Sequence, residues 1–233
     1  MAFTKLFVLT LITAINLQEI YGHGMMMDPI NRSSAWRKGF PVEPNYTDNE
    51  HFCGGYGIQH GTNGGKCGEC GDNYALSRPR PNENGGIYGT GVIVQKLLLY
   101  CQCVYYIIFH LRRYKAGSTI DVTVKLTAAH LGYFEFSLCP LKSNQELETD
   151  KCFNTYPLPR ADGKGYRYPI AVNVAKEYTI SLILPKNVTC KQCVLRWHYN
   201  TGNSWGTCED GAQRVGCGPQ ETFRSCADVT ITN

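Results

Sequence analysis

The sequence predicts one all-β domain, an antiparallel β-sandwich whose long loops are pinned by disulfides. From residue 91 onward, short segments alternate apolar and polar residues, and no segment carries a strong helical pattern. Twelve cysteines are spread along the chain. Alternation over a few residues is typical of a half-buried strand, and several such strands separated by Gly, Pro and Asn turns are typical of a sandwich.

The strands are expected where this alternation is regular. The predicted strands are residues 91–95, 119–127, 133–139, 177–184, 193–199 and 227–231. Residues 23–90 are instead rich in Gly, Pro and Asn, which predicts loops and turns with little regular structure. We expect Cys53, Cys67 and Cys70 to pin this loop region.

The first twenty-two residues have the pattern of a secretory signal peptide. Lys5 precedes a short apolar run over residues 6–12, and Gly22 stands before a candidate cleavage point. The run is too short to span a bilayer, which takes roughly 20 apolar residues. We therefore predict a signal at 1–22 and a secreted, extracellular domain over 23–233. Signal rules alone leave a start one to three residues away open.

Two pairs of cysteines have C-x-x-C spacing, at residues 67–70 and 190–193. That spacing suits either a zinc site or disulfides, and a secreted chain favours disulfides. N-x-[ST] sequons at Asn31, Asn45 and Asn187 fit a secreted glycoprotein.

The formal net charge is +4 and is spread along the chain. Without a Lys/Arg run, the sequence has no nucleic-acid footprint. We expect no nucleic acid and no membrane as partner, and a monomeric chain.

One segment does not suit a sandwich. Residues 96–112 form a dense apolar block that contains Cys101 and Cys103. It is too interrupted for a transmembrane helix and is compatible with a buried strand or a hairpin. Without its two cysteines, ten remain, enough for five disulfides.

Cleavage after Gly22 would make His23 the first residue of the mature chain. A terminal His offers two nitrogens, its α-amine and its ring Nδ1, and the pKa of an α-amine is about 7.7–8.0, so a metal can displace its proton. A second imidazole would complete a three-nitrogen site suited to copper. His130 is the candidate, because it follows a predicted strand. A single His in such a turn is more often structural, and the other histidines compete for the role: His51, His60, His110 and His198.

The segment before the last predicted strand contains Glu221 and Phe223. If this segment begins the strand, the two side chains share one face and could meet one site. The alternative is a core Phe223 beside a surface Glu221.

Four segments together carry a resemblance to a known family. They are HGMM (23–26), AAHLGYF (128–134), GNSWG (202–206) and GCGPQETF (216–223). In this order and spacing the chain resembles the lytic polysaccharide monooxygenases, in particular auxiliary activity family fifteen, formerly grouped with the chitin-binding type-4 domains. The likeness covers the whole predicted mature chain.

The resemblance implies an immunoglobulin-like sandwich with a flat, copper-bearing face. His23 and His130 match the two histidines that bind the copper ion, and Phe223 matches the axial position. Ala128 matches the small residue that shapes access to the metal. Glu221 matches the polar residue that orients the oxygen species.

The implied reaction is oxidative cleavage of crystalline polysaccharide, chitin first and cellulose second. It would use one copper ion, an external electron donor, and hydrogen peroxide or dioxygen as co-substrate. Paired carboxylates for hydrolysis have no clear signature here. Surface aromatics such as Tyr56, Trp36 or Tyr166 are candidates to stack on sugar rings.

By the same resemblance, Gln95 should run almost directly into Arg113. We hypothesise that the block at about 96–112 is an insertion outside the enzyme core, either real or a gene-model artefact such as a retained intron. Transcript sequencing that finds the segment in the abundant message would contradict the artefact.

Two other classes of function remain open at this point. A non-catalytic, secreted chitin-binding module would share the sandwich and the surface aromatics. A disulfide-rich structural matrix protein would need neither His23 nor His130.

Overall fold

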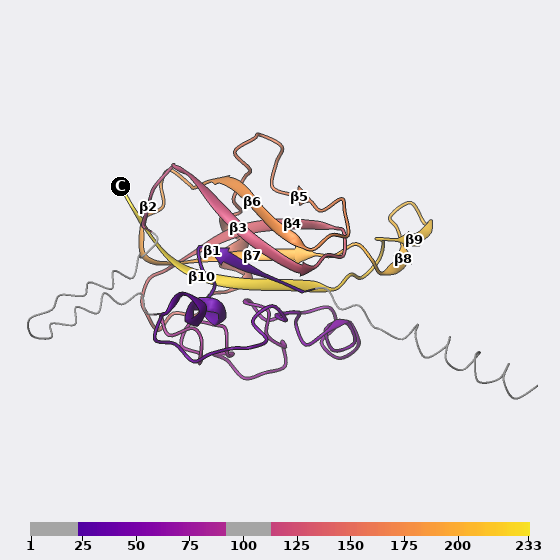
Figure 1. Ribbon diagram of the computed structural model, residues 1–233, viewed down its shortest axis with the longest axis horizontal. Helices are drawn as coiled ribbons and strands as arrows, with labels where there is room; N and C mark the ends of the chain where they lie inside the picture. Colours follow the sequence, from indigo (N-terminus) through magenta and orange to yellow (C-terminus); the bar gives the residue numbers. More distant parts are fainter. Residues whose placement is uncertain (1–22, 92–112) are drawn as a thin grey trace, which may run out of the picture.

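The computed structural model describes residues 23–91 and 113–233 of the chain, and they form a sandwich of two β-sheets (Figure 1). The smaller sheet has the order β1-β3-β6, and its strands are β1 (His23–Asp28), β3 (Thr119–Ala128) and β6 (Lys176–Ile183). All of its pairings are antiparallel. The all-β sandwich predicted from the alternation is confirmed.

The larger sheet has the order β2-β10-β7-β4-β5. Its strands are β2 (Arg113–Lys115), β10 (Thr222–Thr232), β7 (Cys190–Asn200), β4 (Tyr133–Leu141) and β5 (Tyr168–Pro169). Only β2 runs parallel to its neighbour, β10. A separate hairpin, β8 (Trp205–Thr207) with β9 (Gln213–Val215), projects from one end of the sandwich (Figure 1).

The core lies between the two sheets and is rich in aromatic rings. Every second residue of β3 is buried, as its alternation predicts: Ile120, Val122, Val124 and Leu126. From the opposite sheet, Trp197 and Phe134 meet edge to face, with ring centroids 5.3 Å apart, and both are completely buried. Such contacts add to the free energy gained by burying the rings.

The loop region contains more regular structure than its composition predicts. Its first six residues form β1, which the Gly, Pro and Asn content of residues 23–90 had hidden. A short 3-10 helix covers Arg32–Lys38 and a π-helical turn covers Gly57–Thr62. A one-and-a-half-turn helix, α2 (Asp150–Thr155), lies further along the chain. Within residues 23–90, β1, the 3-10 helix and the π-helical turn are the exceptions to the predicted loops and turns with little regular structure.

The last strand also differs from its prediction. It begins at Thr222 rather than at residue 227, because the segment pairs with β7 from Thr222 opposite Asn200 onward. Gly91 lies outside any strand, and the rest of the predicted strand over 91–95 falls outside the described residues. So do the predicted signal at 1–22 and the apolar block at 96–112.

All ten cysteines that the structure describes are paired in five disulfides. The pairs are Cys53–Cys67, Cys70–Cys226, Cys139–Cys152, Cys190–Cys193 and Cys208–Cys217. Cys67 and Cys70 have different partners, and Cys190 and Cys193 bond to each other, so neither C-x-x-C pair forms a zinc site. The expected disulfides are confirmed.

Charged groups also hold the loop region against the larger sheet. The buried guanidinium of Arg32 donates from Nε to Asp228 of β10 at 2.8 Å, and from Nη1 to the buried carboxylate of Glu148 at 2.5 Å. Removing one partner of such a buried pair leaves an uncompensated charge. The loop region therefore shares its stabilising interactions with β10, below which it lies in Figure 1.

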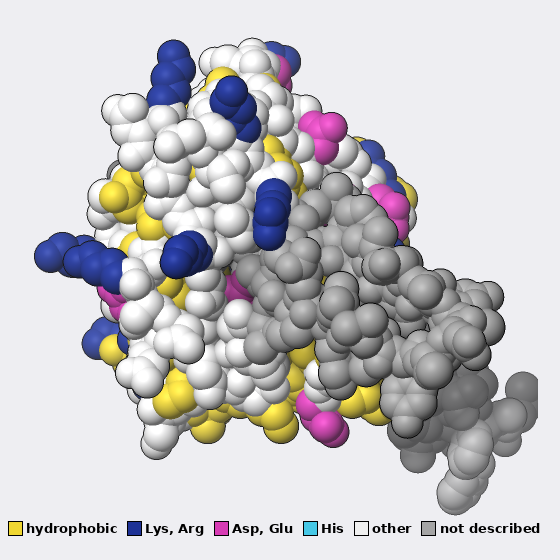
Figure 2. Space-filling view, turned by 90° about the vertical axis from the view of Figure 1, so that its left-hand side faces the viewer, with side chains coloured by type: hydrophobic (Ala, Val, Ile, Leu, Met, Phe, Trp, Pro, Cys, Tyr) yellow, Lys and Arg dark blue, Asp and Glu magenta, His cyan; other side chains and the backbone are white. Residues whose placement is uncertain are grey.

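One end of the molecule shows how its charged side chains are distributed. In Figure 2, Lys and Arg side chains stand apart from one another on the visible surface, with Asp and Glu among them. In the described part of the chain, no helix is both long and apolar enough to cross a membrane.

Removal of the Cys70–Cys226 disulfide is expected to destabilise the whole fold. The bridge spans 156 residues and ties the loop region to β10. The double variant Cys70→Ala/Cys226→Ala should lose about 3–5 kcal/mol of unfolding free energy, measured by guanidinium denaturation.

The matched control removes Cys208–Cys217, which spans only 9 residues in the projecting hairpin. Cys208→Ala/Cys217→Ala should lose about 2.5 kcal/mol, a smaller loss, because a short closed loop restricts the unfolded chain less. Equal losses in the two double variants would contradict the role given to Cys70–Cys226.

Candidate functional site

Strand pairing brings His23 to the end of β3. In the register of β1 and β3, His23 lies opposite Ala128, two residues before His130. The Thr127 hydroxyl donates to the His23 carbonyl at 3.3 Å. His23 and His130, far apart in sequence, are thereby placed at the same end of the sandwich.

Gly24 fixes how closely β1 approaches the core. A Cβ at this position would lie 2.5 Å from Leu126 Cδ2 and 3.1 Å from the ring of Trp197. The Gly24 amide also donates to the carbonyl of Asn49 at 3.0 Å. A larger residue at this position would require Leu126 or Trp197 to move, so glycine at residue 24 helps to set the position of His23.

The loop that carries His130 is tight and fully bonded. The backbone amide of His130 donates to the Tyr199 hydroxyl at 2.8 Å, and that hydroxyl donates to the Leu131 carbonyl at 2.7 Å. Leu131 and Gly132 have φ angles of +52° and +87°, a left-handed turn in which a Gly132 Cβ would lie 2.1 Å from the Asn200 carbonyl oxygen. The turn therefore requires glycine and holds His130 in a buried position.

Each of the two rings has one nitrogen engaged by a neighbouring side chain. His23 Nε2 lies 3.4 Å from Glu50 Oε1. His130 Nδ1 lies 2.8 Å from the Asn203 amide. These contacts leave Nδ1 of His23 and Nε2 of His130 for another ligand, and a bonded partner on one ring nitrogen is what orients a metal-binding histidine.

The electrostatics agree that the two rings are neighbours. The pKa of His130 is lowered, first by burial and then by the charge of His23. The lowered pKa favours the neutral imidazole of His130, which is the form that binds a metal.

Phe223 is a core residue next to this pair. It is completely buried on β10, opposite Tyr199 in the strand register. Its ring centroid lies 5.9 Å from that of Tyr199 and 6.1 Å from that of Phe52. Phe223 thus packs near the ring of Tyr199, whose hydroxyl holds the His130 loop.

Glu221 is not a surface charge, so that half of the alternative was wrong, whereas its other half, a core Phe223, agrees with the structure. It precedes β10, is 7% exposed, and its carbonyl accepts from the Thr201 amide at 3.1 Å. Burial raises the pKa of its carboxyl to about 7. Its charge also acts on the Tyr199 hydroxyl and contributes to the raised pKa of that group. Glu221 and Phe223 therefore converge on Tyr199 from neighbouring positions.

The other described histidines have partners elsewhere. Buried His51 has its Nε2 3.1 Å from Ser33 Oγ, and His198 Nδ1 accepts from Arg224 at 3.2 Å. The ring of His60 lies 2.9 Å from the Gln220 carbonyl. His198 thus has a bonded partner within the fold, as expected for its place in a strand, and His110 lies outside the described residues.

Sequence reasoning missed four residues that support the site: Glu50, Tyr199, Asn203 and Trp205. Asn203 and Trp205 fall within the GNSWG segment, so that motif carried a signal. Tyr199 belongs to an alternating strand and looked like ordinary core. Glu50 stands in a polar loop and nothing in its neighbourhood distinguishes it.

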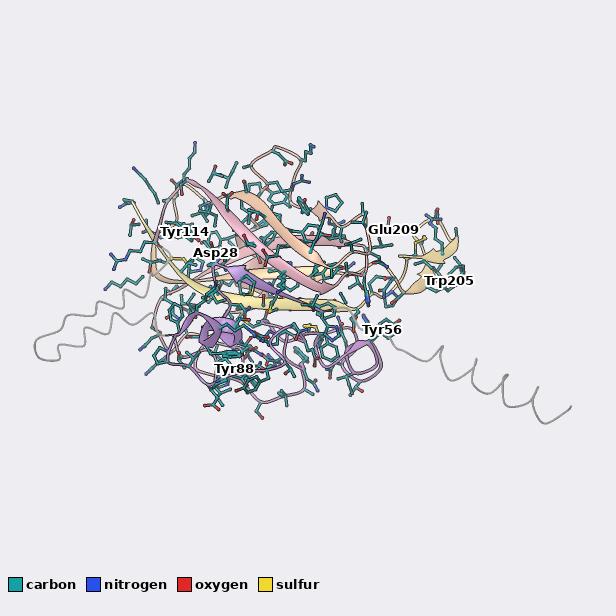
Figure 3. The ribbon with its side chains drawn as sticks, viewed as in Figure 1. Asp28, Tyr56, Tyr88, Tyr114, Trp205 and Glu209 are labelled. Carbon is teal, nitrogen blue, oxygen red and sulfur yellow. A yellow bond between two sulfur atoms is a disulfide. The ribbon has the colours of Figure 1, made fainter. Side chains whose placement is uncertain are left out.

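Trp205 is the most exposed tryptophan, at 63%, and it pairs with Val215 across the projecting hairpin. Figure 3 shows it at the same end of the molecule as Tyr56. Contacts connect the two: Tyr56 packs on His60 with centroids 4.8 Å apart, His60 meets Gln220, and Gln220 Oε1 accepts from the Ser204 amide at 2.9 Å. Trp36, by contrast, packs on Tyr46 at 5.2 Å and under Arg37.

Comparison with known proteins identifies relatives of the chain. The sequence profile of a family described as lytic polysaccharide mono-oxygenase, cellulose-degrading, matches residues 23–229. The chain is similar to a solved structure, the AA15 lytic polysaccharide monooxygenase from Thermobia domestica in the Cu(I) state. Their identity is 47% and the TM-score is 0.81, over 90% of this chain and 98% of that one.

A second solved structure, a chitin binding domain from Burkholderia pseudomallei, matches with 11% identity and a TM-score of 0.43, over 91% of this chain and 100% of that one. That likeness is too low to support any inference. No curated protein matches the sequence at a significant level.

Buried His51 makes a testable contribution to the pH dependence of stability. Burial lowers the pKa of His51 to about 4, against the opposing charge of Asp48. The unfolded chain binds this proton near pH 6.5 and the folded chain does not, so stability is lost as the pH falls from about 6.5 to about 4. We expect this group to contribute about 2–3 kcal/mol to that loss.

The measurement is the unfolding free energy by urea titration at several pH values in this window. His51→Gln should lose part of the slope, whereas His60→Gln, at a half-buried position, should keep the wild-type slope. If the pH slope of the unfolding free energy were unchanged in His51→Gln, the wild-type His51 would have to bind its proton in the folded chain as it does in the unfolded chain.

Proposed function

The chain belongs to the lytic polysaccharide monooxygenase family and is a copper-dependent oxidoreductase that cleaves polysaccharide, and on that premise we propose that His23 and His130 hold its copper ion and that its substrate is crystalline chitin. The observation that carries the proposal is the convergence of the two histidines at one end of the sandwich. Cellulose, which the description of the family profile names, is the alternative substrate.

The donor set fits copper. Once the chain is cleaved after Gly22, His23 supplies its α-amine and its Nδ1, and His130 supplies Nε2. Three neutral nitrogens with open positions suit copper, which stands at the top of the affinity order of divalent metals. The family match begins at His23, which supports cleavage at that point. Five disulfides support export to an oxidising compartment.

When bound, copper supplies the one-electron chemistry by which hydrogen peroxide or dioxygen, with an external electron donor, oxidises the sugar chain. The residues of the chain orient and shield that chemistry. Glu50 and Asn203 hold the two rings through the nitrogens that face away from the metal. Phe223 offers no donor atom, so it would add no ligand to the metal. Ala128, without a bulky side chain, would keep the approach to His23 open.

Glu221 is suited to hold a proton near the site. Its buried carboxyl has a pKa of about 7, so both protonation states are accessible at neutral pH. A group of this kind could orient an oxygen co-substrate by donating or accepting a hydrogen bond.

The surface near His130 favours chitin. Asn173 Oδ1 accepts from the Leu131 amide at 3.1 Å, so the segment around Asn173 adjoins the His130 loop. Val172 and Val174, on either side of it, are 46% and 56% exposed. Exposed apolar groups of this size suit the acetamide methyl groups that chitin has and cellulose lacks. Trp205 and Tyr56 add aromatic faces on which sugar rings can stack.

The proposal predicts both copper binding and its loss. The processed chain should bind one copper ion tightly by calorimetry and release oxidised oligosaccharides from crystalline chitin with copper and ascorbate, detected by mass spectrometry. His130→Ala should abolish these products and weaken copper binding. The control His198→Gln alters an imidazole away from the site and should retain both.

Three outcomes would change the conclusion. Tight binding to chitin without copper binding or oxidised products would favour the non-catalytic chitin-binding module. Oxidised products from cellulose alone would correct the substrate. If the chain bound neither copper nor polysaccharide, the structural matrix protein would be the remaining interpretation.

Trp205 is predicted to increase the affinity for crystalline substrate. Trp205→Ala should weaken binding roughly 3–10-fold, the equivalent of one aromatic stacking contact, in a pull-down with chitin particles. Tyr166→Ala is the control. Tyr166 is 50% exposed and lies in the segment before β5 rather than on the hairpin β8–β9. Equal effects of the two variants would show that substrate does not bind at the hairpin.

A further inference from the structure

The three sequons of the chain have very different surroundings in the folded protein. Only their Asn Nδ2 atoms matter for N-glycosylation, because that nitrogen forms the bond to the sugar. A glycan can remain on a folded chain only where Nδ2 faces solvent. The positions of Asn31, Asn45 and Asn187 therefore decide which sequon can carry one.

Asn31 is closed to modification. It is 1% exposed, and its Nδ2 donates to the Met26 carbonyl at 2.7 Å and to Ser34 Oγ at 2.8 Å. Its Oδ1 caps the 3-10 helix by accepting from the Ser34 amide at 3.1 Å. Ser33, the hydroxyl residue of this sequon, is completely buried. A sugar on Asn31 would break both Nδ2 bonds and could not fit.

Asn45 is half-buried with its nitrogen directed inward. Its Nδ2 lies 3.4 Å from Nε2 of the buried His51. Its Oδ1 accepts from the backbone amide and the hydroxyl of Thr47, at 2.9 and 3.0 Å. Its backbone carbonyl accepts from Trp36 Nε1 at 3.1 Å. Turning Nδ2 outward would break these side-chain bonds.

Asn187 has the opposite arrangement. It lies in the turn between β6 and β7, and both Asn187 and Thr189 are exposed. Val188, between them, is buried in the hydrophobic core. The side chains of Asn187 and Thr189 therefore face solvent together, while the side chain between them enters the core. The turn is also anchored, since the Gly117 amide donates to the Pro185 carbonyl at 3.2 Å.

The turn is remote from the histidines. Ile183 at the end of β6 pairs with Thr119, whereas His23 pairs with Ala128 at the other end of the same β3 strand. At about 3.3 Å per residue, the two ends of β3 lie roughly 30 Å apart. Figure 2 looks onto the end that carries β2 and the C-terminus, and the charged side chains visible there stand apart from one another.

We propose that Asn187 is the N-glycosylation site of this chain, and that its glycan stands at the end of the sandwich opposite His23 and His130. The step rests on the proposed secretion. The Asn187 Nδ2 loses one proton and bonds to the anomeric carbon of a lipid-pyrophosphate-linked oligosaccharide, whose bond to the pyrophosphate breaks as that group leaves. The placement leaves the site end free to lie on a solid substrate.

The test uses the full chain secreted from insect cells. Peptide-N-glycosidase treatment in heavy-oxygen water converts each glycosylated Asn into labelled Asp, and peptide mass spectrometry then locates it. Label at Asn187 alone is expected. Label at Asn31 or Asn45, or an unlabelled Asn187 in the folded secreted protein, would overturn the proposal.

Matched variants control for the sequon itself. Thr189→Ser keeps the sequon and should keep the glycan, whereas Thr189→Ala and Asn187→Gln should both remove it and change the intact mass by one glycan. Copper affinity, measured on the same samples, separates this proposal from the proposed function. It should be the same with and without the glycan, and a severalfold change would place Asn187 near the metal and contradict the remote position.

Discussion

The pairing of β1 with β3 is the constraint on which the site depends. It places His23 opposite Ala128, and a slip of one residue would turn every side chain of β1 to the other face. Gly24 leaves room for the ring of Trp197 to approach β1. The position of the first histidine is thus set by the same packing that stabilises the sandwich.

The second histidine depends on a different kind of interaction. Tyr199, on β7 of the larger sheet, holds the His130 loop through a single hydroxyl. That hydroxyl accepts from the His130 amide and donates to the Leu131 carbonyl. Glu221 and Phe223 both act on this tyrosine, one by charge and one by ring contact. Hydrogen bonding and core packing therefore meet at one residue, Tyr199.

Much of the fold could be predicted from the sequence, because strands such as β3 bury one face and expose the other. β1 was missed for a physical reason. Gly24, Met25 and Met26 are buried in succession, so the segment does not alternate, and it is a strand because β3 pairs with it. His23 and His130 were nominated by chain position and by resemblance. Glu50 and Asn203 reach the rings through contacts between distant segments, which no local pattern encodes.

The hairpin β8–β9 has a consequence for how enzymes of this kind can diversify. Its tip is closed by the bond from the Cys208 amide to the Ala212 carbonyl, Cys208–Cys217 links the end of β8 to the segment after β9, and its strands pair only with each other. The residues that join it to the sandwich, Asn203 and Gln220, lie at its base. The tip can therefore change in sequence without changing the sandwich. Replacing the residues between Asn203 and Gln220 would alter which solid surface the protein binds, while the imidazole held by Asn203 would keep its orientation.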